Sequence, residues 1–239
     1  MRKYLIVAFA ALTALAFTTV ALAQTPAATM KVKVAPKKAG TKKKPKNSSI
    51  DLNIKNNDDQ KTLSELDITA PKTFKLSAKG LTKCSKADLD PSTGVGPSAC
   101  PKASKVGGGE ANALLGVGGT SPQPLHFDVT AFVVGSNEIW FYLHSDQPEL
   151  NLVSPGKISG RHLKIQVPPN AQQPLPGVYA GLVDIHTTLK GKKGKKYLAS
   201  TTGCKKKKHA FSTKLTFIDN GVSPAGDVVV KANSKCSGK

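Results

Sequence analysis

Two short pairs of histidine and aspartate offer the best candidate chemistry in this sequence: His126-x-Asp128 and Asp184-x-His186. Residues two apart on a β-strand project to one face of the sheet, so each pair would present an imidazole beside a carboxylate. On neighbouring strands, the four side chains could bind a divalent metal or perform acid–base catalysis. The same pattern also fits ordinary solvent-facing residues on the polar face of an antiparallel sheet, which is the simpler interpretation.

The common catalytic motifs do not occur in the sequence. It has no G-x-G-x-x-G fingerprint, no P-loop, no H-E-x-x-H pair and no G-x-S-x-G elbow. We therefore predict a non-catalytic protein without catalytic residues, cofactor or metal site. An enzyme built on the two histidine–aspartate pairs remains the alternative.

Four cysteines, Cys84, Cys100, Cys204 and Cys236, are the second group of reactive side chains. They lack the paired C-x-x-C spacing of a structural zinc site. In an oxidising compartment they would form two disulfides, although four cysteines permit three pairings. We predict sequential pairing, Cys84 with Cys100 and Cys204 with Cys236.

The first 23 residues have the features of an export signal. Arg2 and Lys3 precede an apolar run, and Ala21-Leu22-Ala23 forms a small-x-small cleavage site before Gln24. Cleavage there would leave a chain that does not span a membrane. The alternative is a single membrane anchor, which the length of the apolar run permits. We expect a protein that is secreted or associated with the cell envelope.

Lysine dominates the charge, since the chain has 35 Lys and Arg against 15 Asp and Glu and a formal net charge of +20. Lysine is a point charge that attracts polyanions with little selectivity. Aromatic residues make up only 5% of the chain, so we do not expect a specific nucleic-acid partner. We expect anionic cell-envelope polymers as partners, and solvated loops that aid solubility are the alternative. The candidate polyanion-binding residues are Lys42, Lys43, Lys44, Lys192, Lys193, Lys195, Lys196, Lys205, Lys206, Lys207 and Lys208.

The only tryptophan raises the question of carbohydrate binding. Trp140 and Tyr142 would share one face of a strand, with Phe141 on the other. An exposed aromatic platform could stack on a sugar. A tryptophan within a β-sandwich strand is more typical of the core, and that is our expectation.

Short segments with period-two alternation, separated by Gly, Pro and Asn, indicate an all-β protein. We predict an antiparallel, immunoglobulin-like two-layer sandwich after an N-terminal signal helix, with a barrel as the alternative. Residues 24–30 would be a flexible leader and 31–239 a single domain. The strands are predicted at 31–34, 50–54, 63–69, 73–76, 110–117, 125–134, 138–144, 157–167, 178–189, 197–201, 209–218 and 227–230. Ser85 is expected to cap a single helical turn.

Three cysteine- and lysine-bearing segments carry a family resemblance. They are K-A-G-T-K-K-K-P-K-N at 38–47, G-L-T-K-C-S-K-A-D-L at 80–89 and G-P-S-A-C-P-K-A-S-K-V-G-G-G at 96–109. Together they resemble a group of uncharacterised exported bacterial proteins in which the cysteine-bearing segments recur. The resemblance implies a structural role for the cysteines and an extracytoplasmic location, and no reaction or ligand. A structural or binding role is therefore predicted, and a module that binds another protein is a further alternative.

Overall fold

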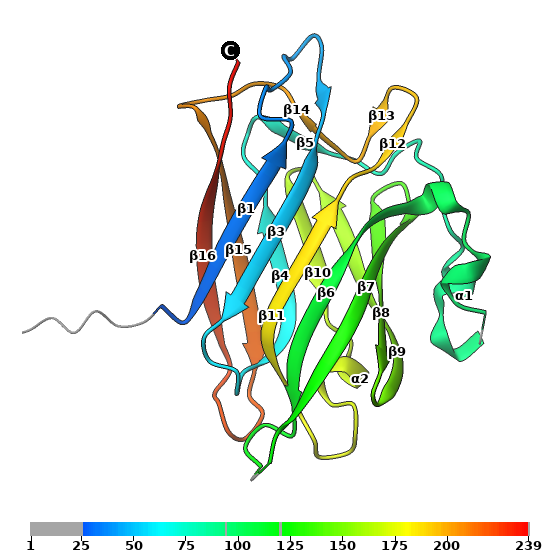
Figure 1. Ribbon diagram of the computed structural model, residues 1–239, viewed down its shortest axis with the longest axis vertical. Helices are drawn as coiled ribbons and strands as arrows, with labels where there is room; N and C mark the ends of the chain where they lie inside the picture. The colour runs from blue at the N-terminus through cyan, green and yellow to red at the C-terminus, as the bar shows by residue number, and fades with distance from the viewer. Residues whose placement is uncertain (1–25, 94, 120, 239) are drawn as a thin grey trace, which may run out of the picture.

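The computed structural model describes residues 26–93, 95–119 and 121–238. The described chain is mostly β-structure, and eleven strands form one antiparallel sheet (Figure 1). The prediction of an all-β antiparallel fold is confirmed. The strands of the large sheet are β1 (Ala28–Ala35), β3 (Ser49–Asn56), β4 (Thr62–Thr69), β6 (Lys105–Leu115), β7 (Gln123–Gly135), β8 (Glu138–Asp146), β9 (Glu149–Ser159), β10 (His162–Gln166), β11 (Ala180–Leu189), β15 (Lys208–Ile218) and β16 (Gly226–Lys235).

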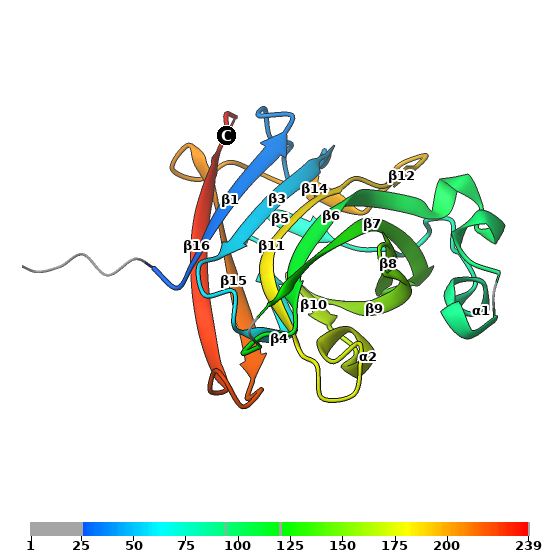
Figure 2. The same cartoon turned by 60° about the horizontal axis from the view of Figure 1, so that its bottom comes forward.

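The large sheet curls until its two end strands meet, so the molecule is nearly barrel-shaped. The strand order is β1-β3-β11-β6-β7-β8-β9-β10-β4-β15-β16. Figure 2 shows β16, at one end of this order, lying beside β1 at the other. Of the two predicted architectures, the barrel therefore describes this sheet better than two separate layers do.

Side chains and one short backbone contact close the seam between β1 and β16. The hydroxyl of Ser234 on β16 accepts a hydrogen bond from the backbone N–H of Val34 on β1, at 2.9 Å. Beyond the end of β1, the N–H of Ala39 donates to the carbonyl of Ser237 at 2.8 Å. These bonds satisfy backbone groups that an open sheet edge would leave to solvent.

The core fills the inside of the curled sheet, because inward positions alternate with outward ones along each strand. On β7, Leu125, Phe127, Val129 and Ala131 are buried, while His126 and Asp128 between them are exposed. The same alternation buries every second residue of β15 from His209 to Phe217. Both strands therefore follow the period-two alternation that indicated β-structure in the sequence.

The first disulfide joins Cys84 to Cys100, as predicted, and it holds a segment on the outside of the barrel. The segment contains α1 (Lys86–Leu89), with Ser85 as its N-cap, and the short 3-10 helices η1 (Pro91–Thr93), η2 (Pro97–Ala99) and η3 (Lys102–Ser104). Both cysteines and Leu89 pack on Phe132 and Tyr142 in a small cluster of their own. The disulfide-stapled segment 84–100 therefore forms a second, small hydrophobic core with the outer face of the sheet.

Trp140 corrects the expectation of a core tryptophan. It shares the outer face of β8 with Tyr142, as predicted, and it is only partly buried at the edge of the stapled cluster. The ammonium of Lys86 lies 5.2 Å from the Trp140 ring centroid and 2.8 Å from the carboxylate of Glu138. These contacts occupy the aromatic surface that a sugar would need.

Two smaller sheets and a short helix complete the fold. One sheet has the order β2 (Lys46–Asn47), β14 (Ala199–Thr201), β5 (Phe74–Leu76), and the other is the hairpin of β12 (Lys192–Lys193) and β13 (Lys196–Tyr197). Both lie at one end of the barrel, while α2 (Pro169–Gln172) lies at the opposite end (Figure 1).

The segment predicted as one strand over 157–167 is two strands, and most of β9 was missed. Gly160 turns the chain with a φ of 60°, so β9 ends at Ser159 and β10 begins at His162. β9 has a weak strand signature because its inward positions include Ser154 and Gly156, and Pro155 interrupts it. A proline in a run argues against a central strand, yet here it pairs opposite Trp140.

Two further strands differ from the expected boundaries or faces. β6 begins at Lys105 rather than 110, because its three glycines lie within the strand. A Cβ at Gly109 would lie only 1.9 Å from the carbonyl oxygen of His186, so the close approach of β11 requires glycine there. On β11, a register shift lies between Leu182 and Asp184, and Leu182 is buried whereas Val183 is only partly buried.

The N-terminal predictions fall mostly outside the described residues. Residues 1–25, which include the predicted signal peptide, are not among them, and β1 already begins at Ala28 within the range predicted as a leader. In the described part of the chain, no helix is long and apolar enough to cross a membrane.

We predict that Ser234→Ala destabilises the protein by about 1–3 kcal/mol, because it leaves the buried N–H of Val34 without its acceptor. Urea denaturation at neutral pH would measure the change. Ser159→Ala, at an exposed position on β9, is the control and should change stability by less than about 0.5 kcal/mol. Equal effects of the two substitutions would show that the seam bond contributes nothing.

Candidate polyanion-binding end

Three lysine-rich connections leave the barrel at the same end. Strand pairing determines this arrangement: the last residue of β1, Ala35, pairs with Ser49 at the start of β3, and Leu189 at the end of β11 pairs with the adjacent Ile50. Thr69, the last residue of β4, pairs near the start of β15. We call this region the basic end and define it as segments 36–48, 70–80 and 190–208.

The small sheet of β2, β14 and β5 ties the three segments together. Each strand comes from a different segment, with Lys46 paired to Thr201 and Lys75 paired to Ser200. The buried hydroxyl of Thr201 also accepts a hydrogen bond from the N–H of Gly40 at 3.1 Å. Segments distant in sequence therefore form one scaffold beneath the lysines.

The hairpin of β12 and β13 carries four of the predicted lysines. Gly194, with a φ of 55°, turns the chain between Lys193 and Lys196, which pair with each other. The stem of Lys196 lies over Gly80, where an added Cβ would be 3.2 Å from its Cγ. This contact joins the hairpin to the neighbouring segment.

The second disulfide, between Cys204 and Cys236, confirms the predicted pairing and anchors the four consecutive lysines. Cys236 N–H also donates to the carbonyl of Lys207 at 3.0 Å. Lys206 and Lys207 have φ values of 52° and 55°. This is a left-handed backbone conformation that residues other than Gly, Asn and Asp rarely adopt. Two lysines thus occupy a tight turn where Asn-Gly would be the favoured sequence.

The basic end contains eighteen lysines and no acidic residue. All are exposed except Lys46, which is partly exposed. In the part of the chain that the structure describes, the lysine ion pairs involve Lys61, Lys86, Lys164 and Lys214, none of which belongs to the basic end. The eighteen are Lys37, Lys38, Lys42, Lys43, Lys44, Lys46, Lys72, Lys75, Lys79, Lys190, Lys192, Lys193, Lys195, Lys196, Lys205, Lys206, Lys207 and Lys208.

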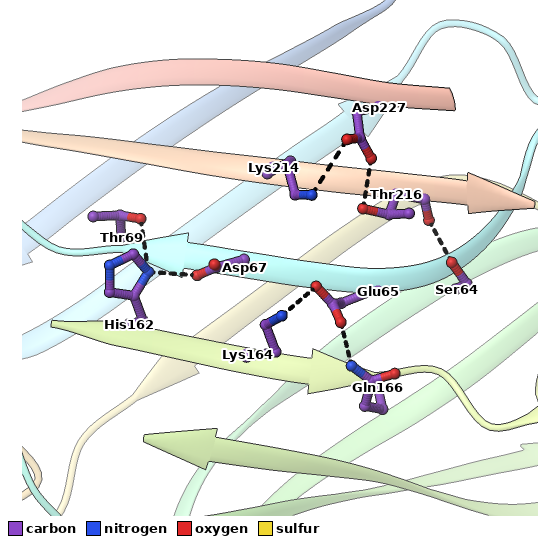
Figure 3. A network of polar contacts seen from close by, with 10 residues as sticks. All are labelled: Ser64, Glu65, Asp67, Thr69, His162, Lys164, Gln166, Lys214, Thr216 and Asp227. Atoms are coloured by element: carbon purple, nitrogen blue, oxygen red, sulfur yellow. Dashed lines mark hydrogen bonds and ion pairs between the residues drawn. The ribbon is translucent and has the colours of Figure 1, made fainter. Parts of the chain in front are cut away.

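On the wall of the barrel, some lysines form ion pairs with carboxylates. Across β10, β4, β15 and β16, carboxylates neutralise them in the network of Figure 3. Lys164 lies 2.9 Å from Glu65, a hydrogen bond that raises the pKa of the lysine ammonium. Lys214 lies 3.2 Å from Asp227, whose pKa is lowered by the Thr216 hydroxyl and by Lys214. Carboxylates thus neutralise Lys164 and Lys214 on the wall, whereas no lysine of the basic end has a carboxylate partner among the described residues.

A buried histidine lies beneath the basic end. His209 is fully buried, its ring packs edge-on against Phe74 at 4.8 Å, and its Nδ1 lies 3.4 Å from the Thr73 hydroxyl. Its Nε2 is buried without a hydrogen-bond partner among the described residues. Burial lowers the pKa of this imidazole below its ordinary value near 6.5, so the neutral ring is favoured.

The histidine–aspartate pairs share one outer face of the barrel, as predicted, but β6 separates their strands. Asn112 of β6 bridges them: its Nδ2 donates to Asp184 at 2.9 Å, and its Oδ1 accepts from His126 Nδ1 at 2.8 Å. His186 lies instead between Asp51 and Glu110, at 3.6 and 3.9 Å. Within the described residues, no group of three or more His, Cys, Asp or Glu could hold a metal ion.

His144 on β8 belongs to a polar cluster that the sequence did not indicate. Its Nδ1 lies 2.8 Å from the Asn151 Oδ1 and its Nε2 lies 3.0 Å from Asp146. Tyr142 donates to the same Asn151 oxygen at 2.8 Å. The Asn151 bond, followed by Asp146, raises the pKa of His144. Finding this cluster required the pairing of β8 with the unpredicted strand β9.

Exposed large hydrophobic residues bear on the alternative of a partner-binding module. Those that the structure describes are Val95, Leu175, Val222 and Val229, and they come from four different segments of the chain.

The fold and the charge define a disulfide-stapled all-β barrel with a lysine-rich end. Comparison with protein-family models, with curated proteins and with solved structures found no match.

We predict that His209 makes the protein less stable below about pH 6.5. Because its pKa is lowered in the folded state, the unfolded chain binds the proton more readily. The stability is complete above the unfolded pKa of about 6.5, and it falls by up to about 1.4 kcal/mol per pH unit as the pH drops from there toward the folded pKa. Urea denaturation between pH 7 and 5 would measure this slope.

The matched variants are His209→Phe and His126→Gln. Phenylalanine keeps an aromatic ring beside Phe74 without the unpartnered nitrogen, so this variant should lose most of the slope. The second variant replaces an exposed histidine and should keep it. An unchanged slope in His209→Phe would assign the acid sensitivity to other groups.

Proposed function

We propose that this protein is a secreted or envelope-associated, non-catalytic binding protein that holds anionic cell-envelope polymers through its basic end. The observation that carries the proposal is the convergence of eighteen lysines, all exposed except the partly exposed Lys46 and without any acidic residue, on one end of the barrel. Loops that served solubility alone would gain nothing from gathering at one end. Two disulfides support an oxidising, extracytoplasmic compartment, where such polymers occur.

The binding mechanism is diffuse electrostatics. Lysine ammonium groups are strongly hydrated point charges and lack the planar fork with which arginine recognises phosphate, so spacing of charge matters more than individual geometry. A flexible polymer with a phosphate on each repeat can satisfy many of them at once and release its condensed counterions. Affinity should therefore fall steeply with salt, because the Debye length shrinks from about 10 Å at 0.1 M to about 3 Å at 1 M.

The strained turn at Lys206 and Lys207 supports the proposal independently. A left-handed conformation costs an ordinary L-residue roughly 1–2 kcal/mol, and glycine avoids most of that cost. The sequence nevertheless keeps lysine at both positions, held by the neighbouring disulfide. Strain of this kind is typical of residues retained for function rather than stability.

We predict that removing the four lysines of the β12–β13 hairpin weakens polymer binding. The variant Lys192→Gln/Lys193→Gln/Lys195→Gln/Lys196→Gln should bind long-chain polyphosphate and teichoic acid at least about tenfold more weakly at 50 mM salt. Its plot of log affinity against log salt should also be shallower, since fewer charges take part. Isothermal titration calorimetry over a salt series would measure both quantities.

The matched control removes four exposed lysines from the barrel wall and gives the same net charge. In Lys31→Gln/Lys55→Gln/Lys157→Gln/Lys231→Gln, affinity should decrease by less than threefold, or roughly 0.7 kcal/mol. Equal losses in both variants would mean that net charge, not the basic end, governs binding. If the affinity of the unaltered protein did not change between 50 and 500 mM salt, the electrostatic mechanism would be disproved.

We predict opposite effects on stability and binding for Lys206→Asn/Lys207→Gly. The new turn relieves the left-handed strain, so the free energy of unfolding should rise by about 1 kcal/mol. Polyphosphate affinity should fall because two charges are lost. Lys206→Arg/Lys207→Arg keeps both the charge and the strain and serves as the control. A variant that is more stable and binds equally well would remove this turn from the site.

A further inference from the structure

The barrel wall lines an apolar cavity, partly open to the surroundings, that the basic end does not use. Its volume is about 120 Å³, and its walls come from β3, β4, β6 to β11 and α2. Phe127 and Phe141 form part of one wall, and Leu66 and Leu182 lie among the residues around it. None of the lining residues is charged, within the part of the chain that the structure describes.

Small side chains at inward positions create this space. β6 contributes Ala111 and Ala113 where other strands place leucine or phenylalanine, and β11 begins with the buried Ala180. Between the larger side chains of the barrel these alanines leave a gap. Protein interiors normally pack to the density of organic crystals, so a gap of this size in a well-formed barrel is a specific feature.

Besides Asn112, whose side chain bonds Asp184 and His126, two hydroxyl residues belong to the cavity lining. Ser154 on β9 and Thr187 on β11 are both buried, with 5% of each residue exposed. Thr187 donates to the carbonyl of Gly108, at 3.4 Å, which is a long bond. A few polar groups set in an apolar wall are the usual composition of a small-molecule site.

The helix α2 lies at the end of the barrel opposite the lysine-bearing small sheets (Figure 1). Ala171 of α2 contributes to the lining. The helix is short, and the Gln172 side chain ties it to β10 by donating to the carbonyl of Val167 at 2.6 Å. Entry from this end would not involve the basic end.

We propose that the cavity is a binding site for a small uncharged apolar molecule about the size of benzene, with room for one hydroxyl or carbonyl group near Ser154. An apolar protein cavity of about 150 Å³ takes up benzene or xenon, so one of 120 Å³ fits a ligand of about six heavy atoms. Ions are excluded because a charge in this lining would have no partner.

Benzene and phenol are the probes for a thermal denaturation test of the folded chain. When its free concentration is several times its dissociation constant, each probe should raise the Tm by about 2–4 °C. The variants Ser154→Leu and Ala113→Leu place side-chain atoms in the cavity and should abolish the rise. Ala103→Leu, at an exposed position on the stapled segment, should retain it.

Crystals of the unaltered protein under xenon pressure give a second readout that needs no variant. Xenon between Phe127, Phe141 and Leu182 would confirm the site even if both filling variants failed to fold. A Tm that does not respond to either probe, together with no xenon in the barrel, would disprove the proposal. Equal responses in wild type and in a folded filling variant would place the probes elsewhere and also disprove it.

Discussion

The packing of β1 against β16 determines the shape of this molecule, because it brings together the two free edges of an eleven-stranded sheet. The bond from Val34 to Ser234 joins the two edges directly, and the Thr213 hydroxyl of the next strand, β15, contacts the Met30 sulfur of β1 at 3.1 Å. Closure shields both edges from pairing with other chains. The last residues of β1 and β11 and the first residues of β15 lie around one rim of the closed sheet, where the lysine segments attach.

Like charges at one rim repel each other, so the scaffold beneath them has to be stiff. Three features supply that stiffness: the sheet of β2, β14 and β5, the Cys204–Cys236 disulfide and the aromatic packing around His209. The lone buried imidazole is the weak point of this arrangement, since its protonation would add a further positive charge under a field that is already positive. The stability of the rim and its charge are therefore linked through one residue.

The sequence predicted most of the strands and both disulfides but not the meeting of the lysines. Alternation in segments such as 125–134 is a local signal, and local signals identify strands well. Most of β9 was not predicted, because its inward positions hold Ser154 and Gly156 and a proline lies between them. The basic end depends on which strand ends lie side by side, which the pairing of Leu189 with Ile50 determines and which no single segment contains. The histidine–aspartate pairs were correctly assigned to one face, whereas the intervening Asn112 on β6 followed only from strand order.

The first and last described strands leave the barrel at opposite rims. Ala28 pairs with Asn56 at the rim away from the lysines, whereas Cys236 is bonded directly into the lysine-bearing rim. Anything joined ahead of Ala28, such as an affinity tag or a solid support, would thus leave the lysines pointing outward and accessible. A tag at the C-terminal side would sit among them. The N-terminal side is therefore the better point of immobilisation for a protein whose lysine-bearing rim has to stay exposed.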